Sequence, residues 1–231
     1  MIRALLLDVD GTLIDSNDAH AQAWMEALKE EGYNVPLREV RRRIGMGGDN
    51  LLPSLLGISD SDPKAKTMSH RHGEIFREKY LRELKPFPGV RELIDHLRGL
   101  GLQLVIATSS KKKDLELLLG QAGLKDLLLD STSADDASSS KPSPDIVQAA
   151  WKKTGCRKEE VLMIGDTPYD IEAAKRAGVR IIALTCGGWT RDELKDRGAD
   201  AVYTDLADLL ENLTTSPILS AAEIGSGPPQ H

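Results

Sequence analysis

The chain opens on an apolar run that ends in two aspartates, ALLLDVDGT at residues 4–12. A short apolar run without a polar face is typical of a strand that is buried on both sides in a parallel sheet. Gly11 permits a sharp turn directly after it. We therefore predict a buried strand over Ala4–Val9, with Asp8 and Asp10 at its carboxyl end.

Further short apolar runs follow along the chain, at Gln103–Ala107, Val161–Ile164, Arg180–Leu184 and Ala201–Tyr203. Amphipathic segments with helical spacing lie between or after them, at residues 90–100, 111–123, 143–154, 168–177 and 205–213. Strands that alternate with helices form parallel sheets whose two faces the helices cover. The sequence predicts an α/β fold, with a doubly wound, Rossmann-like parallel sheet as its core.

Residues 16–86 break this alternation, because they show helical periodicity at 19–31 and 63–83 but no strand pattern. We interpret residues 16–86 as an inserted all-helical cap domain. Prolines and a glycine at 86–89 mark its end. The catalytic core is then expected at residues 1–15 and 87–214. Residues 215–231 are rich in Ser, Pro and Gly, and we expect them to form a flexible tail.

Composition narrows the possible partners. The 231 residues carry a net charge of -6, which disfavours nucleic acid because a phosphate backbone needs a basic surface. No apolar run approaches the roughly 20 residues that span a bilayer, and Asp8 follows too soon for a signal peptide. Cys156 and Cys186 show no metal-ligand spacing and are expected to be buried fillers. We expect a cytoplasmic protein, a monomer or weak homodimer, without membrane or nucleic-acid partners.

Chemically active side chains follow several of the predicted strands. In open α/β sheets, residues at the carboxyl ends of the strands face a common crevice. The candidates are Asp8, Asp10 and Gly11 after the first strand, Thr108 and Ser109 after the second, Lys141 in a loop, and Asp166 and Asp170 after the strand at 161–164. So many carboxylates in one place repel one another unless a hard cation neutralises them. Oxygen ligands suit Mg²⁺, which we predict as the cofactor.

These residues meet the needs of phosphoryl transfer. Asp8 can act as nucleophile, and Asp10 lies on the same side of an extended segment, where it can serve as general acid and then general base. Lys141 supplies positive charge and Thr108 a hydroxyl donor. The N–H of Gly11 is expected to face the phosphate. Ser109 is a candidate phosphate ligand, but it can equally cap the helix that follows.

The motifs resemble those of the haloacid dehalogenase superfamily. The resemblance rests on DVDGT at 8–12, Thr108 after an apolar strand, SKP at 140–142 and GDTPYD at 165–170, in the family's order. It implies Mg²⁺ held by Asp8, the Asp10 carbonyl and Asp166, with Asp170 as a more distant partner. Asp170 could instead support the start of the helix after it. Many such phosphatases have glycine where this chain has Ser140.

The resemblance also concerns the cap, which is similar to the helical type of phosphoglycolate phosphatases, sugar-phosphate phosphatases and β-phosphoglucomutases. His20 and Trp24 lie one helical turn apart, and we expect this face to look toward the site. One of the arginines at 41–43, before the glycine-rich loop at 44–48, is expected to contact substrate. The polar cluster at 70–72 is interpreted as surface, and the lysines at 111–113 as a solvated helix start.

We expect a phosphoric monoester hydrolase that forms an aspartyl-phosphate and acts on a small phosphorylated metabolite, phosphoglycolate or a sugar phosphate. Asp10 favours phosphate chemistry over dehalogenation, which needs no acid at that position. A phosphomutase is the main alternative, although the arginine that such mutases carry after the cap glycine is replaced by Gly47 and Gly48. Phosphonate cleavage would require a cap lysine near the first motif, and the loop at 45–50 contains none. A non-catalytic regulatory protein is a further alternative, since fold alone does not fix function.

Overall fold

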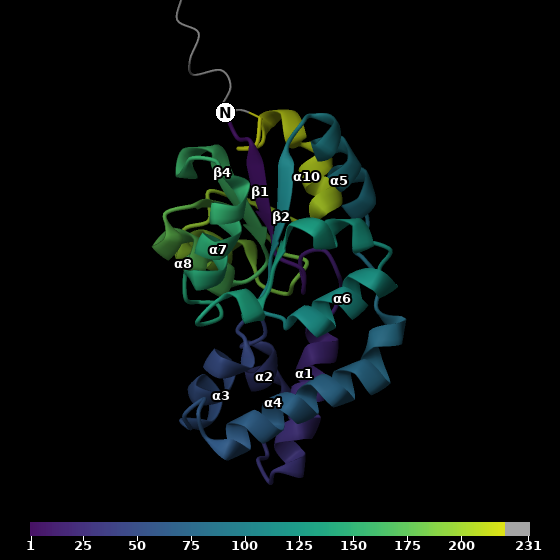
Figure 1. The fold of residues 1–231 in the computed structure, drawn as a ribbon, viewed down its shortest axis with the longest axis vertical. Coiled ribbons are helices and arrows are strands. Elements are labelled where there is room, and N and C mark those ends of the chain that lie inside the picture. Colours follow the sequence, from purple (N-terminus) through teal and green to yellow (C-terminus); the bar gives the residue numbers. More distant parts are fainter. Residues whose placement is uncertain (220–231) are drawn as a thin grey trace, which may run out of the picture.

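The fold is built on one parallel sheet with helices on both faces (Figure 1). The computed structural model describes residues 1–219, without the side chains at 128 and 129. The strands are β1 (Ala4–Leu7), β2 (Gln103–Ala107), β3 (Ser131–Thr132), β4 (Val161–Gly165), β5 (Arg180–Leu184) and β6 (Ala201–Tyr203). All of them run parallel, in the order β3-β2-β1-β4-β5-β6. The predicted α/β class and doubly wound core are confirmed.

Strand β1 lies in the middle of the sheet and is buried along its whole length. Leu6 pairs with Val105 of β2 on one side and with Met163 of β4 on the other. Successive side chains of a strand point to opposite faces. Leu5 and Leu7 accordingly enter one apolar cluster, whereas Leu6 enters the other. An apolar run without alternation is what a strand needs when both faces are covered.

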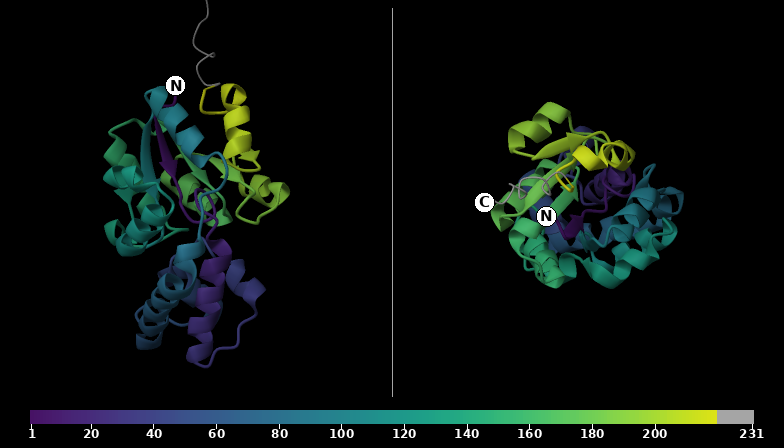
Figure 2. Two further views of the ribbon diagram at one scale, coloured as in Figure 1. Left: turned by 90° about the vertical axis from the view of Figure 1, so that its right-hand side faces the viewer. Right: turned by 90° about the horizontal axis from the view of Figure 1, so that it is seen from above.

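Helices cover the two faces (Figure 2). The first apolar cluster includes residues of α5 (Val90–Gly99), α6 (Lys112–Gln121) and α10 (Leu206–Glu211). The second includes residues of α7 (Asp145–Thr154), α8 (Pro168–Ala177) and α9 (Arg191–Arg197). Short 3₁₀ turns connect the elements, at Lys125–Asp130, Ala134–Asp136, Lys158–Glu160 and Leu213–Thr215. The core therefore has three layers.

A separate group of helices lies at the lower end of the molecule in Figure 1, and we call residues 17–83 the helical unit. It contains α1 (Asn17–Glu30), α2 (Leu37–Arg41), α3 (Gly48–Leu56), α4 (Pro63–Ile75), a π-helical turn (Phe76–Tyr80) and a 3₁₀ turn (Leu81–Glu83). The helical unit has an apolar cluster separate from those of the core, and it includes Trp24, Leu51 and Met68. The unit lies against the carboxyl ends of the strands.

Two neighbouring chain segments join the helical unit to the core. Ile14 and Pro86 form an isolated antiparallel bridge. The N–H of Asp15 donates to Lys85 O at 3.1 Å, and the N–H of Phe87 donates to Leu13 O at 2.9 Å. The chain thus leaves and re-enters the core at one place, and we call this paired crossing the neck.

The observed elements differ from the predicted ones in places. Strand β1 ends at Leu7, two residues before the predicted end. Strand β3 was not predicted, because two residues give no pattern. Helix α9 was not predicted either, because a single buried apolar residue, Leu194, marks its inner face. Helices α2 and α3 are additional elements inside the predicted helical interval.

The flexible tail was predicted to begin at residue 215, and this predicted start is too early. Ser216 and Ile218 are buried, and Ile218 packs in the first apolar cluster. The Ser216 hydroxyl donates to Leu213 O at 2.7 Å, which fastens this segment to the preceding turn. Residues up to 219 therefore belong to the packed core, and the rest of the predicted tail lies outside the described residues.

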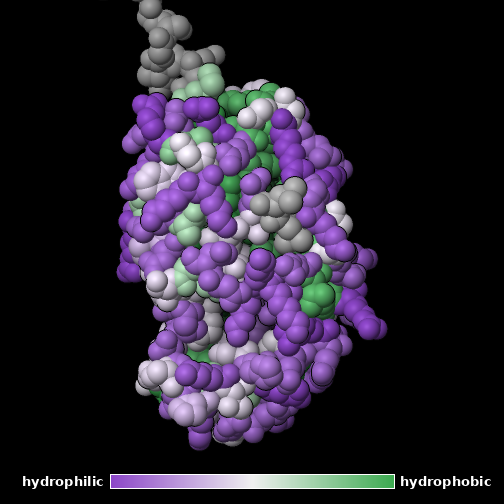
Figure 3. All heavy atoms as spheres, in the orientation of Figure 1, coloured by the Kyte–Doolittle hydropathy of each residue, from purple (hydrophilic) through white to green (hydrophobic). Residues whose placement is uncertain are grey.

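No helix among residues 1–219 is both long enough and apolar enough to cross a membrane. The face of the molecule seen in Figure 3 is mainly hydrophilic, with small apolar patches.

Candidate active site

The candidate site lies where the strand order reverses, between β1 and β4. Ligands of open α/β sheets bind at such points, beyond the carboxyl ends of the strands. Asp8 directly follows β1, and Asp166 directly follows β4. Thr108 follows β2, and Lys141 comes from the loop between β3 and α7. All four side chains are buried. The structure thus brings together the residues that the sequence analysis selected from separate strands.

Lys141 is the central cation of the site. Its Nζ donates to Asp8 Oδ1 and, at 2.6 Å, to Asp170 Oδ1. Burial lowers the pKa of Lys141, but Asp170 and Asp8 outweigh burial, so the pKa is raised and the ammonium form is held. Burial raises the pKa of Asp8 to about 7, against the lowering effect of Lys141.

Asp166 is held by two side chains from the segment after β1. The Thr12 hydroxyl donates to its Oδ1 at 3.0 Å, and Asn17 Nδ2 donates to its Oδ2 at 2.9 Å. Burial, and after it the charges of Asp170 and Asp8, raise the pKa of Asp166 well above its ordinary value. A carboxyl group in this state favours the neutral form unless a cation comes close.

Close backbone approach shapes this part of the site. Gly11 has φ of +80°, and a Cβ there would lie 2.0 Å from Asn17 Nδ2 and 2.4 Å from Asp166 Oδ2. From the sequence we expect the N–H of Gly11 to face a phosphate. That detail is wrong, because this N–H donates to Ile14 O at 2.8 Å and closes the turn after β1. Gly11 contributes space and turn geometry.

The residues present fit a divalent metal ion. Oxygens of Asp8, Asp166 and Asp170 lie within 4.8 Å of one another, and all three residues are buried. Three carboxylates against the one ammonium of Lys141 leave two negative charges uncompensated. Asn17 Oδ1 is buried beside them without a hydrogen-bond partner among the described residues. Hard oxygen ligands with a surplus of two negative charges match Mg²⁺.

Asp10 stands apart from this cluster, since its carboxylate is not among the clustered oxygens. Its Oδ1 accepts from the Ser16 hydroxyl at 2.6 Å and lies 3.0 Å from His20 Nε2, while its Oδ2 accepts from the Ser110 hydroxyl at 2.7 Å. Burial alone would raise the pKa of Asp10. The lowering effects of His20, Ser16 and Ser110 together are larger, so the pKa of Asp10 lies well below its ordinary value. Asp10 lines the pocket, and its carboxylate does not belong to the group of oxygens that could hold a metal ion.

Thr108 and Ser109 occupy the expected loop after β2. Thr108 is buried, and its Oγ1 accepts from the N–H of Ser110 at 3.1 Å. Ser109 Oγ donates to Gly45 O at 3.4 Å and accepts from the N–H of Lys141 at 3.3 Å. Both residues line the pocket described next, whereas the cap position of α6 is taken by Lys111. Helix capping by Ser109 is therefore excluded.

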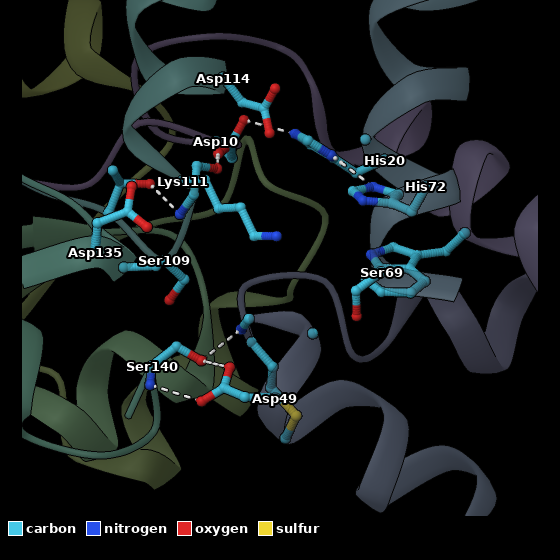
Figure 4. A pocket seen from close by; sticks show the side chains of 18 of the residues that line it. Asp10, His20, Asp49, Ser69, His72, Ser109, Lys111, Asp114, Asp135 and Ser140 are labelled. Carbon is cyan, nitrogen blue, oxygen red and sulfur yellow. Dashed lines mark hydrogen bonds and ion pairs between the residues drawn. The ribbon is translucent and has the colours of Figure 1, made fainter. Parts of the chain in front are cut away.

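A pocket of about 580 Å³ separates the core from the helical unit, with Asp8 and Asp10 at its base. His20 and Trp24 of α1 line it, as their shared helix face predicted. His20 stacks on Phe76, with ring centroids 3.9 Å apart, and His72 stacks on Trp24 at 4.2 Å. Figure 4 shows Asp10 and His20 pointing toward one another, with His72 behind His20.

The cluster at 70–72 is not simply surface, as the sequence analysis proposed. His72 Nε2 lies 3.2 Å from His20 Nδ1, and both His70 and His72 line the pocket. Burial, followed by the charge of His20, lowers the pKa of His72 well below its ordinary value. His72 therefore extends a chain of contacts from Asp10 into the helical unit.

The predicted arginine contact with substrate is wrong. Arg41 donates to Gly187 O at 2.7 Å, Arg42 pairs with Glu193 at 2.6 Å, and Arg43 bonds to Glu39 at 3.2 Å. None of the three lines the pocket. Besides three histidines, the basic side chains that do are Lys66, Arg77, Lys111 and Lys113. The lysines at 111–113 are exposed at the start of α6, as predicted, and Figure 4 shows Lys111 reaching into the pocket.

Sequence reasoning missed Ser16, Asn17 and Ser110, which bind the carboxylates of Asp10 and Asp166. Their positions in the sequence, close to strand ends, indicated that they lie near the site. Ser16 and Asn17 lie within nine residues of Asp8, and Ser110 lies two residues after Thr108. A polar residue that close to a strand end faces the same crevice.

Three comparisons with known proteins agree with this geometry. The phosphoglycolate phosphatase of Rhodospirillum rubrum is 29% identical over 218 residues, which cover 90% of this chain and 90% of that protein. The crystal structure of a hydrolase from Pseudomonas syringae matches with a TM-score of 0.87 and 34% identity, over 92% of this chain and 98% of that one. CbbY from Rhodobacter sphaeroides, crystallised in complex with phosphate, matches with a TM-score of 0.75 and 28% identity, over 90% of this chain and 96% of that one.

The family model described as haloacid dehalogenase-like hydrolase matches residues 5–184. That match runs from β1 to β5 and includes every aspartate of the site together with Lys141. With a doubly wound sheet, buried carboxylates at its switch point and a match over most of its length, the chain belongs to the haloacid dehalogenase-like hydrolases.

Proposed function

We propose that this protein is a magnesium-dependent phosphoric monoester hydrolase that uses Asp8 as nucleophile. The observation that carries the proposal is the position of the Asp8 carboxylate. It lies at the base of a pocket, beside Lys141, with a second carboxylate, Asp10, facing the same pocket. A nucleophile, a fixed positive charge and a separate acid–base group are the three needs of ester hydrolysis through a covalent intermediate.

In the first step, an Asp8 oxygen attacks phosphorus, and the bond from phosphorus to the ester oxygen breaks. Asp10 gives its proton to the leaving oxygen, so the alcohol departs and an aspartyl-phosphate remains on Asp8. The pKa of Asp10 is low in the free protein because His20, Ser16 and Ser110 outweigh burial. A dianionic phosphate beside Asp10 raises that pKa and favours the protonated form that this step needs.

In the second step, water attacks the phosphorus of the aspartyl-phosphate. Asp10, now a carboxylate, takes a proton from that water, and the bond between phosphorus and the Asp8 oxygen breaks. Orthophosphate leaves, and Asp8 and Asp10 return to their starting states. Ser16, His20 and Ser110 keep the Asp10 carboxylate aimed at the pocket in both steps.

Lys141, which pairs with Asp8, and the Thr108 hydroxyl, which borders the pocket, would hold oxygens of the phosphoryl group. Mg²⁺, held by Asp8, the Asp10 carbonyl and Asp166, would supply charge neutralisation on that group. Asp170 acts by orienting Lys141, because its Oδ1 accepts from Nζ while its Oδ2 accepts from the Thr167 hydroxyl at 2.6 Å. Ser109 and His20 border the space that the substrate would occupy.

The substrate that we propose is a small phosphorylated metabolite, phosphoglycolate or a sugar phosphate. A pocket of about 580 Å³ is in the range of small-molecule sites. Two relatives support this substrate class. One is a phosphoglycolate phosphatase, and the other is a mutant of CbbY from Rhodobacter sphaeroides that was crystallised in complex with xylulose bisphosphate. We propose that the helical unit is the cap that closes over this substrate, with the neck as its hinge, and that the protein works in the cytoplasm as a monomer or weak homodimer.

A phosphomutase would need a cap side chain to hold a second phosphate. The positions after the cap glycine leave no room for one. A Cβ at Gly47 would lie 2.2 Å from Ser140 Oγ, and a Cβ at Gly48 would lie 2.9 Å from Ser69 Oγ. This crowding disfavours the mutase arrangement at these two positions, where such enzymes carry an arginine.

The test is release of orthophosphate from a panel of esters that includes phosphoglycolate, hexose phosphates and nucleotides, with and without Mg²⁺. Asp8→Asn is the matched variant, since it keeps the shape of the side chain and removes the nucleophile. We expect metal-dependent release by the wild-type protein and none by the variant. Equal release by both would exclude Asp8 as nucleophile, and no release from any ester would favour a mutase or a non-catalytic role.

A further inference from the structure

One contact between the helical unit and the core falls beside Lys141. Asp49 and Asn50 lie in the first turn of α3, and Ser140 is the residue directly before Lys141. Figure 4 shows Asp49 and Ser140 facing one another on the side of the pocket opposite to Asp10 and His20. The contact therefore joins the helical unit to the loop that carries the central cation of the site.

The polar groups of Ser140 are all engaged by the helical unit. Its N–H donates to Asp49 Oδ2 at 2.9 Å, and its hydroxyl donates to Asp49 Oδ1. Its hydroxyl oxygen also accepts from the N–H of Gly47 at 3.1 Å, and its carbonyl accepts from Asn50 Nδ2 at 2.9 Å. Ser140 itself is 3% exposed. We call these bonds the latch.

The latch reaches Lys141 through one peptide link. Asn50 Nδ2 also lies 3.4 Å from Lys141 O, and the N–H of Lys141 donates to Ser109 Oγ at 3.3 Å. The backbone of Lys141 is thus fixed on one side by the helical unit and on the other by the loop after β2. Since Nζ must meet both Asp8 and Asp170, a small shift of this backbone misplaces the ammonium.

The segment that carries the latch is anchored at its other end as well. Arg41 donates to Gly187 O at 2.7 Å, and a Cβ on Gly187 would lie 1.7 Å from Asp166 Oδ2. Arg42 stacks on the ring of Trp189 at 3.6 Å. Residues 41–50 therefore lie across the site, with one end beside Asp166 and the other beside Lys141.

We propose that Asp49 and Asn50 are positioning residues, which set Lys141 against Asp8 and Asp170 by clamping Ser140 when the helical unit is closed on the core. This inference rests on the proposed function of Lys141. It gives the closed state a chemical consequence, because the cation reaches its working position only when the latch is formed.

Asp49→Ala removes the two carboxylate oxygens that accept from Ser140, and Ser140→Ala removes the hydroxyl that donates to Asp49 and accepts from the N–H of Gly47. A hydrogen bond to a charged group contributes about 1.5–3 kcal/mol, so we expect Asp49→Ala to lower kcat about tenfold or more, with KM within about twofold of wild type. The double variant D49A/S140A should lose less than the sum of the two single variants, because both substitutions break the hydrogen bond between Asp49 and the Ser140 hydroxyl. Glu78→Gln is the matched control, since Glu78 is an exposed carboxylate of the helical unit without a contact to the pocket.

A second measurement does not depend on turnover. Amide hydrogen exchange over residues 138–143 should become about tenfold faster in Asp49→Ala and stay unchanged in Glu78→Gln. Unchanged exchange in Asp49→Ala would overturn the latch, whether or not the wild-type protein hydrolyses any ester. Faster exchange with a change in KM alone, or additive losses in the double variant, would show that Asp49 contacts substrate and does not position Lys141.

Discussion

The Nζ of Lys141 lies 2.6 Å from Oδ1 of Asp170, and both side chains are almost fully excluded from solvent. The same ammonium also pairs with Asp8. Burying charges costs free energy that pairing offsets only when every partner is present. The charge balance of the site therefore depends on the Lys141 ammonium. Its loss would leave the carboxylates of Asp8 and Asp170 buried without a positive partner.

Lys141→Ala should destabilise the metal-free protein by about 3–5 kcal/mol, because it leaves Asp8 and Asp170 unpaired. Urea unfolding in the presence of a chelator measures this. Lys175→Ala is the control, since Lys175 is exposed and, among residues 1–219, its Nζ donates to a single acceptor, Arg197 O at 3.1 Å. Its loss should cost less than about 1 kcal/mol. Equal effects of the two substitutions would contradict the central place of Lys141.

Asp166→Asn should change how stability depends on pH. Burial and the neighbouring carboxylates raise the pKa of Asp166 in the folded protein. A carboxyl group with a raised pKa contributes stability that is present below its unfolded pKa, about 4, and is lost as pH rises through the folded value. Asparagine does not ionise. The metal-free variant should therefore gain stability over wild type as pH rises, by about 1.4 kcal/mol for each unit of the shift.

Unfolding curves at pH 5 and pH 8, with a chelator and with Mg²⁺, test this. Magnesium should stabilise wild type more at the higher pH, because its ligands must lose their protons, and it should stabilise the variant little. A variant that gains as much stability from Mg²⁺ as wild type does would exclude Asp166 as a ligand.

How much of this site the sequence predicts depends on the kind of contact. Asp8, Thr108 and Asp166 follow apolar strands directly, so the strand pattern alone places them at one edge of the sheet. Lys141 and Asp170 come from a loop and a helix, so no strand end fixes their position, although the sequence placed both among the candidates. His20 and Ser110 could be expected near the site, but their pairing with Asp10 could not be predicted, because the directions of these side chains depend on packing.

The fold shows the same division. Runs such as Gln103–Ala107 and Arg180–Leu184 gave the strand bounds without error, since buried strands are set by their own apolar residues. Strand β3 and helix α9 were missed, because the first is two residues long and the second buries one apolar side chain. Ile218 was assigned to the tail on composition, yet one isoleucine suffices to anchor a segment to a core.

Gly11→Ala should disrupt the site through its Cβ. The added atom would collide with Asn17 Nδ2 and Asp166 Oδ2, and its φ of +80° strains any side chain. Gly32→Ala is the matched control, because Gly32 has φ of +84° but no atom within 4 Å of an added Cβ. Both variants should lose about 1–2 kcal/mol to backbone strain. Only Gly11→Ala should also weaken magnesium binding, as isothermal titration calorimetry would reveal.

Ile218→Ala should destabilise the protein by about 2–5 kcal/mol, since Ile218 is 1% exposed in the first apolar cluster. Thr214→Ala, at an exposed position in the same segment, should change stability by less than about 0.5 kcal/mol. Thermal or urea unfolding compares the two. If both variants were as stable as wild type, residues 215–219 would be dispensable for the core.

The neck has a consequence for how such a chain can diversify. Ile14 and Pro86 lie side by side, so the chain of some seventy residues between them leaves and re-enters the core at a single place, and the sheet remains continuous. Whatever is spliced between those two positions must only begin and end at neighbouring places, and the order of strands stays untouched. A lineage can therefore redesign the helices between them, and with them the range of molecules admitted, as long as the side chains that meet Asp10, Asp166 and Ser140 are kept.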